Sequence, residues 1–270
     1  MLPILEKKPL TVLLLACLFF LWGGITVLQE VFPYQLLKPL LSSTGGFSSA
    51  GDLTTPVIKK ETKNQVELNK QWAKNVISGG YILHFRHAQR EKWNDVQAFD
   101  AYELKKGIDA EHTSFSRAVC LTSQGVEEAK LIGHVFALEK VNISYIVSSP
   151  SCRARQTAMH AFGRIDGINN ALLHRTAMVE DQHPVFAKEL RRLMETVEIK
   201  PGQNVFLSGH AGTLRYDGVT VIDINHTGDI DARDETGFVV IERKDGVLVA
   251  QHLFKSIKEF TTAVVELPIR

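Results

Sequence analysis

The sequence predicts an α/β protein: a three-layer sandwich with a mostly parallel central sheet flanked by helices, preceded by one transmembrane helix. Short β-type runs alternate with helix-like segments from residue 80 onward, which is typical of a sheet covered on both faces. A hairpin signal follows near the carboxyl end. Before these elements, a long uncharged apolar run indicates a membrane span.

The apolar run covers residues 10–28 (LTVLLLACLFFLWGGITVL) and contains no charged side chain. Its length matches the roughly 20 residues that cross a bilayer core. Lys7 and Lys8 precede it, and the next basic residue is Lys38. Because positive charge favours the cytoplasmic side, we expect residues 1–30 to be a cytoplasmic stub and transmembrane signal anchor. The rest of the chain would then be periplasmic or luminal.

Three alternatives to the anchor are weaker. A cleaved signal peptide lacks a clear small-residue cleavage site after the run. A lipoprotein signal ending at Cys17 would leave bulky apolar residues at the mature end. A buried helix of a globular protein does not explain why the run is apolar on all faces.

Residues 41–56 (LSSTGGFSSAGDLTTP) are rich in Ser, Thr and Gly, which is typical of a flexible linker. We expect residues 31–60 to be a spacer and residues 61–270 to be the folded domain.

Local patterns predict the elements of that domain. Val126, Ala129 and Phe136 follow Thr122 at helical spacing, and Thr122 itself is a helix start signal. The turn Lys244-Asp245-Gly246 joins two β-type runs. The expected strands are 81–85, 143–147, 205–208, 237–242 and 247–254, and the expected helices begin at 122 and cover 153–162 and 189–197.

Composition excludes several classes of function. The chain has 31 basic and 30 acidic side chains and a formal net charge of +1, which does not favour a nucleic-acid partner. There is no CxxC pair, so a structural zinc site is not expected, and no cofactor or metal is implied. We expect Cys120 and Cys152 to be free, half-buried thiols.

Reactive side chains follow three of the expected strands. These are Arg86 and His87, the segment from Ser148 to Arg153, and His210. Because sites in open α/β sheets form beyond the carboxyl ends of strands, we expect them to meet. Arginine forks match phosphate oxygens, and a histidine among cations stays neutral and nucleophilic. This constellation predicts metal-free phosphoryl transfer through a phosphohistidine.

Four segments resemble the signature of the histidine phosphatase superfamily, which includes the cofactor-dependent phosphoglycerate mutases. They are residues 83–88 (LHFRHA), 121–125 (LTSQG), 148–158 (SSPSCRARQTA) and 209–213 (GHAGT), in the order of the superfamily. The resemblance covers roughly residues 80–215. The anchor makes the chain similar to small membrane-associated or periplasmic members such as the lipopolysaccharide core heptose phosphate phosphatases. The resemblance implies a phosphoglycerate mutase-like fold.

The resemblance also implies roles for matching residues. His87 would be the catalytic nucleophile, Arg86 and Arg153 would bind phosphoryl oxygens, and His210 would complete the pocket. The proton donor would lie between the third and fourth motifs, where Glu180 is the candidate and Asp181 the fallback.

The implied function is a phosphomonoesterase acting on a phosphorylated sugar, glycan or other small phosphate ester. A mutase-like phosphotransferase and a non-catalytic binder of phosphorylated ligands are the alternatives, and the oligomeric state is open. Residues 90–119 are either a substrate lid or a solvated charged loop, with Arg90, Lys92, Lys105 and Lys106 as candidate contacts. Among the other side chains, we expect His84 to be structural, Arg155 to lie on a helix surface or behind the site, and a surface position for His160, His174, His183 and His226.

Overall fold

The computed structural model describes residues 63–92, 116–174, 183–216, 219–225 and 229–267. These residues belong to one compact unit, Glu61–Arg270. The predicted anchor and spacer therefore lie outside the described residues, as do Glu180, Asp181, Lys105, Lys106 and His226. Within the described ranges, no helix has the length and apolar character needed to cross a bilayer.

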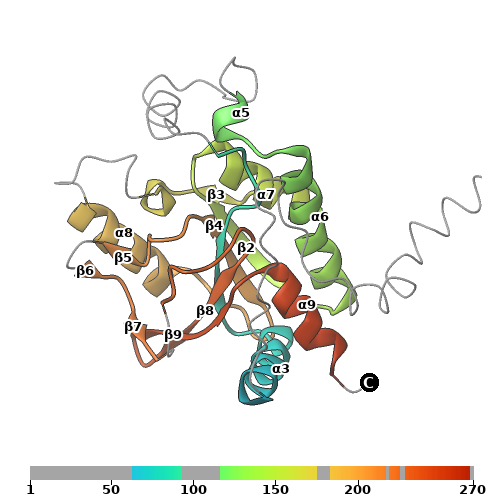
Figure 1. Cartoon of the computed structure of the whole chain (residues 1–270). Coiled ribbons are helices and arrows are strands. Elements are labelled where there is room, and N and C mark those ends of the chain that lie inside the picture. Colours follow the sequence, from blue (N-terminus) through green and yellow to red (C-terminus); the bar gives the residue numbers. More distant parts are fainter. Residues whose placement is uncertain (1–62, 93–115, 175–182, 217–218, 226–228, 268–270) are drawn as a thin grey trace, which may run out of the picture. The chain divides into compact units, whose positions relative to one another are not determined.

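The described elements alternate along the chain as the sequence patterns predict (Figure 1). The helices are α3 (Lys63–Ser78), α5 (Ser116–Val119), α6 (Ser123–Leu138), α7 (Cys152–Phe162), the 3-10 helix η2 (Asn170–Leu172), α8 (His183–Thr196) and α9 (Ile257–Val265). The strands are β1 (Ile82–Arg86), β2 (Ile143–Ser148), β3 (Gly167–Ile168), β4 (Asn204–Gly209), β5 (Arg215–Tyr216), β6 (Val219–Thr220), β7 (Asp223–Ile224), β8 (Phe238–Lys244) and β9 (Val247–Phe254).

Seven strands form a mixed sheet in the order β3-β2-β4-β1-β8-β9-β7. The pairings of β3 with β2, β2 with β4, β4 with β1, and β9 with β7 are parallel. Strand β8 runs antiparallel to both β1 and β9. The β8–β9 turn places Asp245 and Gly246 at positive φ angles of 52° and 78°, as a tight two-residue hairpin requires. The expected mostly parallel sheet is thus joined to an antiparallel hairpin.

Helices cover both faces of this sheet, so the unit has three layers (Figure 1). Alternate residues of β1 point to opposite faces, with Ile82 in one core and Leu83 and Phe85 in the other. Helix α8 and η2 pack on the Ile82 face, and α3, α6, α7 and α9 pack on the other. On that second face, the Phe85 ring stacks on Phe206 and Phe238 at centroid distances of 4.5 and 4.3 Å.

Helix α6 shows how the sequence fixes one element next to the strand ends. Thr122 caps its amino terminus by accepting a hydrogen bond from the Gly125 amide at 3.0 Å. Gly125 also lies against the Gln89 carbonyl, which would be 2.0 Å from a Cβ atom at this position. Only glycine therefore allows α6 to approach the segment that follows β1.

Two expectations about this part of the fold need correction. The helix expected at 189–197 begins at His183, which is buried rather than on the surface. Cys120 and Cys152 are not free thiols but form a disulfide, with Cα atoms 5.0 Å apart across a sequence separation of 32 residues. Helices α5 and α7 bring the two cysteines together in a small buried cluster, a proximity that sequence spacing does not reveal.

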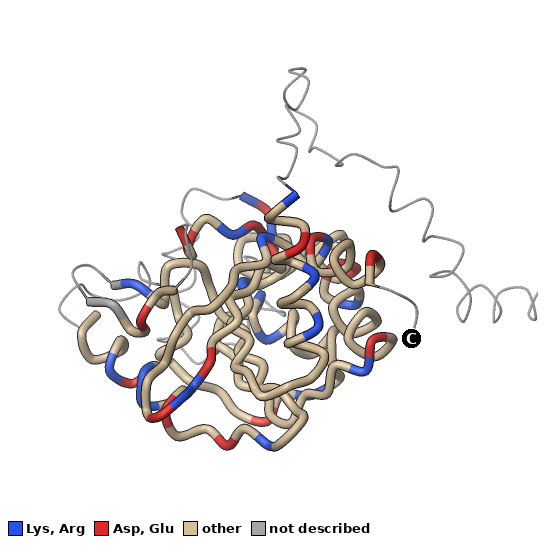
Figure 2. Tube along the Cα trace, turned by 90° about the horizontal axis from the view of Figure 1, so that it is seen from below, with Lys and Arg blue, Asp and Glu red and all other residues tan. Residues whose placement is uncertain are grey.

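Charged residues are distributed over the whole unit. Figure 2 shows basic and acidic positions interspersed along the trace, without a single basic face in this view. This distribution agrees with the near-neutral formal charge of the chain.

Candidate active site

The three segments that carry the predicted site residues meet at one edge of the sheet. Strands β2, β4 and β1 are neighbours and parallel, so their carboxyl ends lie side by side. The ladder continues beyond the strands: the His87 amide donates to the Gly209 carbonyl at 3.0 Å, and the Ser149 amide donates to the Ser208 carbonyl at 2.8 Å. These backbone hydrogen bonds therefore fix the relative positions of His87, His210 and the start of α7.

His87 is oriented by its own chain. Its side chain is buried, and Nδ1 lies 2.7 Å from the Ala88 carbonyl oxygen. Because a carbonyl can only accept, Nδ1 carries the proton and Nε2 keeps its lone pair. Burial, followed by the charge of Arg153, lowers the pKa of His87 well below its usual range, with smaller effects from Arg86 and Arg90. The site thus keeps a neutral imidazole with an available Nε2 at physiological pH.

His210 packs edge-on against His87, with ring centroids 5.1 Å apart. Its Nε2 lies 3.0 Å from the Ser151 hydroxyl and 3.3 Å from the Ser149 hydroxyl, and Arg153 Nη2 lies 3.5 Å from Nδ1. Burial and the Arg153 charge lower the pKa of His210 well below its usual range. His210 is therefore a neutral imidazole held beside His87.

Arg153 brings a buried positive charge to the two imidazoles. It stands in the first turn of α7, is only 2% exposed, and donates to the Val119 carbonyl at 3.4 Å. Helix α7 begins at Cys152, next to Arg153, and the amino end of a helix favours an anion. A phosphoryl group at His87 would be stabilised by both.

Helix α7 also ties down the loops around the site. The Thr157 hydroxyl accepts from the Ala88 amide at 2.9 Å and donates to the Arg153 carbonyl at 2.7 Å. The Gln156 side chain accepts from the Leu121 amide at 2.7 Å. Gln156 and Thr157 of the third motif thus have a structural role, because their side chains hold the segments at Leu121 and Ala88 in place.

Arg86, which the resemblance predicts to bind phosphoryl oxygens, also contacts two other residues of the protein. Its guanidinium donates to the Arg233 carbonyl at 2.7 Å and forms an ion pair with Glu235 at 2.8 Å. Its charge still contributes to the lowered pKa of His87, as does that of Arg90. The positive field at His87 therefore comes from Arg153 first, and then from Arg86 and Arg90.

A buried polar network supports His210 from behind. Arg233 Nη2 donates to His84 Nδ1 at 2.9 Å and to the His210 carbonyl at 3.0 Å. His84 Nε2 then donates to the Thr213 hydroxyl at 3.0 Å, which donates to the His210 carbonyl at 3.1 Å. Burial lowers the pKa of Arg233 to about 10, so it remains charged at neutral pH. The structural role expected for His84 is thus support of His210.

The structure brings the predicted residues His87, His210 and Arg153 together, and it also places residues beside them that the motifs did not indicate. His174 does not simply lie on the surface, because its ring is 5.1 Å from that of His210. Arg233 and Glu235 belong to no motif, and they stand in a charged segment, residues 229–235 (DIDARDE), that gives no signal for a buried position. Arg155 donates to the Pro150 carbonyl at 3.0 Å, and His160 is exposed, both in line with expectation. Arg90, at the start of the segment predicted as a lid, forms an isolated antiparallel β-bridge with Leu121.

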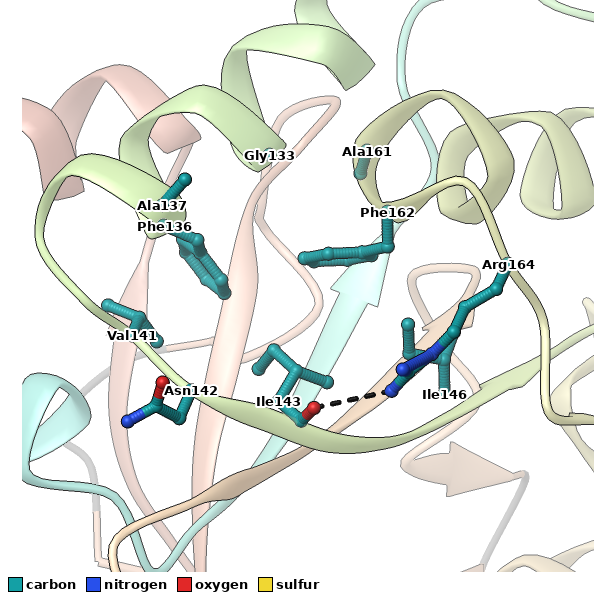
Figure 3. A pocket seen from close by; sticks show the side chains of 10 residues that line it. All are labelled: Gly133, Phe136, Ala137, Val141, Asn142, Ile143, Ile146, Ala161, Phe162 and Arg164. Carbon is teal, nitrogen blue, oxygen red and sulfur yellow. Dashed lines mark hydrogen bonds between the residues drawn. The ribbon is translucent and has the colours of Figure 1, made fainter.

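A separate hollow of about 280 Å³ lies near the carboxyl ends of α6 and α7 (Figure 3). It is lined mainly by apolar side chains of α6, α7 and the amino end of β2, including Phe136, Ile143 and Phe162. Arg164 reaches across its rim to the Ile143 carbonyl at 3.3 Å. The reactive residues lie at the carboxyl end of β2, so this hollow is not part of the candidate site.

Comparison with known proteins gave distant structural likenesses. No protein-family model and no curated protein matches the chain. Three solved structures illustrate the likeness. The protein histidine phosphatase SixA complexed with tungstate is 15% identical, covers 64% of this chain and 96% of its own, and has a TM-score of 0.41. The phosphoserine phosphatase of Entamoeba histolytica in complex with 3-phosphoglyceric acid is 15% identical, with 66% and 98% covered and a TM-score of 0.40.

The alpha-ribazole phosphatase of Shigella flexneri is 14% identical, with 65% and 97% covered and a TM-score of 0.40. Likenesses at this level assign neither a family nor an activity to the chain. The chemistry of the site is inferred from its own side chains.

Proposed function

We propose that this chain is a histidine phosphatase: a membrane-anchored phosphomonoesterase that works through a phosphohistidine at His87. The observation that carries the proposal is the hydrogen bond from His87 Nδ1 to the Ala88 carbonyl, in a buried site beside Arg153. It leaves Nε2 as a neutral nucleophile next to positive charge, which is the combination that attack on a phosphate dianion needs.

The reaction has two steps. In the first, the Nε2 lone pair attacks phosphorus, the bond from phosphorus to the ester oxygen breaks, and the alcohol leaves with a proton from an acid. In the second, water attacks the phosphohistidine and His87 is restored as inorganic phosphate departs. Arg153 and the amino end of α7 stabilise the phosphoryl oxygens in both steps. His210 stands beside the transferring group, fixed by the Ser151 hydroxyl.

We further propose that the site works outside the cytoplasm. Residues 10–28 supply the anchor, with the amino terminus in the cytoplasm and the catalytic unit periplasmic or luminal. The Cys120–Cys152 disulfide supports this assignment, because such bonds persist in oxidising compartments and are rare in the cytosol. A phosphorylated sugar or glycan is the substrate class that fits a small cationic site in that location.

A phosphate-release assay tests the proposal. The full-length chain in mild detergent should hydrolyse p-nitrophenyl phosphate and one or more esters from a panel of sugar, glycan and lipid phosphates. His87→Ala should abolish release. His160→Ala, which changes an exposed histidine of α7, is the matched control and should retain full activity. Equal activity of His87→Ala and the unaltered chain would overturn the proposal.

A further inference from the structure

A third imidazole lies beside the catalytic pair. The His174 ring meets the His210 ring edge-on, with centroids 5.1 Å apart and planes at 72°. Its charge is one of the causes that lower the pKa of His210. His174 keeps partial exposure to solvent, whereas His87 and His210 are buried. His174 is therefore in contact with the buried His210 ring and is also partly exposed to solvent.

The backbone before His174 is held firmly over the end of β4. The Asn169 amide donates to the Ser148 carbonyl at 2.9 Å, and its side chain accepts from the Ala171 amide at 2.8 Å. Leu172 is fully buried, and its carbonyl oxygen would be 3.2 Å from a Cβ atom at Gly209. Glycine at 209 thus lets this segment close over the strand end, which sets His174 against His210.

The proposed reaction needs a group that can give up a proton and take one back. His87 and His210 stay neutral because burial and Arg153 lower the pKa of both. Arginines do not release protons in this range. An imidazole has two ring nitrogens, so it can give a proton to one group and take a proton from another.

Three of the described carboxylates on segments around the site have hydrogen-bond partners in the protein. Glu235 accepts from Arg86 at 2.8 Å, and Asp231 accepts from the Gly212 amide at 2.8 Å. Glu128 accepts from the Gln89 amide at 3.0 Å with one oxygen and from a side-chain amide of α6 with the other.

We propose that His174 is the acid–base group of the site, and this inference rests on the proposed phosphatase function. In the first step His174 gives its proton to the leaving ester oxygen as the bond to phosphorus breaks. In the second it takes a proton from the attacking water as the phosphorus–nitrogen bond breaks and its electron pair returns to His87. The cycle leaves His174 protonated and ready for the next ester. This role is the one that sequence motifs gave to Glu180 or Asp181.

The test compares esters whose leaving groups differ in their need for a proton. Dinitrophenolate leaves readily without one, whereas an alkoxide such as that of glycerol phosphate does not. For His174→Gln in the full-length chain, we expect kcat/KM for glycerol phosphate to fall about 10²- to 10³-fold. We expect kcat/KM for dinitrophenyl phosphate to change less than about threefold, because that step needs no acid. His160→Gln is the control for a histidine on the exposed face of α7.

Each other outcome has a distinct meaning. An equal loss with both esters would make His174 a structural group and overturn the inference, as would no loss with either. If Glu180→Gln or Asp181→Asn gives the selective loss while His174→Gln does not, the acid is elsewhere and the phosphatase proposal stands. If the unaltered chain releases phosphate from neither ester, both proposals fail together.

Discussion

The disulfide between Cys120 and Cys152 offers a quantitative test of the fold. It closes a loop across 32 residues that includes α6 and β2. The chain-entropy relation for a loop of this length gives about 3.7 kcal/mol of stabilisation at 25 °C, mainly by restricting the unfolded chain. For a unit of this size, that free energy corresponds to a fall of about 7–15 °C in Tm when the bond is removed.

The perturbation is the double substitution Cys120→Ala with Cys152→Ala, made in the full-length chain. Both positions are buried in the small cluster with Ala118 and Val119, so alanine introduces no polar group there. Urea unfolding followed by circular dichroism would measure the free energy of unfolding, and thermal unfolding would measure Tm. Cys17→Ala removes the third cysteine and is the matched control, for which no change is expected.

Reduction of the unaltered chain should give the same shift as the double substitution. Mass spectrometry of the alkylated protein would establish that the bond is broken in the reduced sample. If the bond is absent from the oxidised chain, or if its loss leaves both the free energy of unfolding and Tm unchanged, the pairing described above is wrong.

Three further predictions concern the site and its supports. His84, His87 and His210 are buried and their pKa values are lowered, so below about pH 6.5 the unfolded chain binds more protons than the folded one. The free energy of unfolding should therefore fall as acid is added, which a falling urea midpoint would show. Gly125→Ala should lower stability by about 1–3 kcal/mol in the same assay, because its Cβ would clash with the Gln89 carbonyl. Arg233→Met should reduce kcat/KM about tenfold or more in steady-state assays while the chain stays folded, because the His210 carbonyl loses a donor; unchanged kinetics would contradict this supporting role.

Local patterns predicted the elements that carry the site. Thr122 caps α6 as its position suggests, and the hairpin turn at Asp245 and Gly246 is where the sequence signal lies. The carboxyl ends of β1, β2 and β4 meet because parallel neighbours must end at the same edge. The convergence of His87 and His210 therefore follows from rules that act on short segments.

Features that depend on tertiary contact were not predictable in the same way. Helix α3 buries the polar Asn69 together with Ala73 and Val76, so a polar residue stands on its buried face. The disulfide joins cysteines whose spacing does not encode a pair. His174 reaches His210 only because the backbone at Leu172 closes over Gly209, a contact between segments that are far apart in sequence.

The most direct test of the central claim is to trap the covalent intermediate. The full-length chain would be mixed with a radiolabelled phosphate ester, quenched in alkali within one turnover, and digested for peptide mapping. The account predicts an acid-labile, alkali-stable label on the peptide that contains His87, and no label in His87→Asn. Label on another residue, or steady phosphate release from His87→Asn, would contradict it.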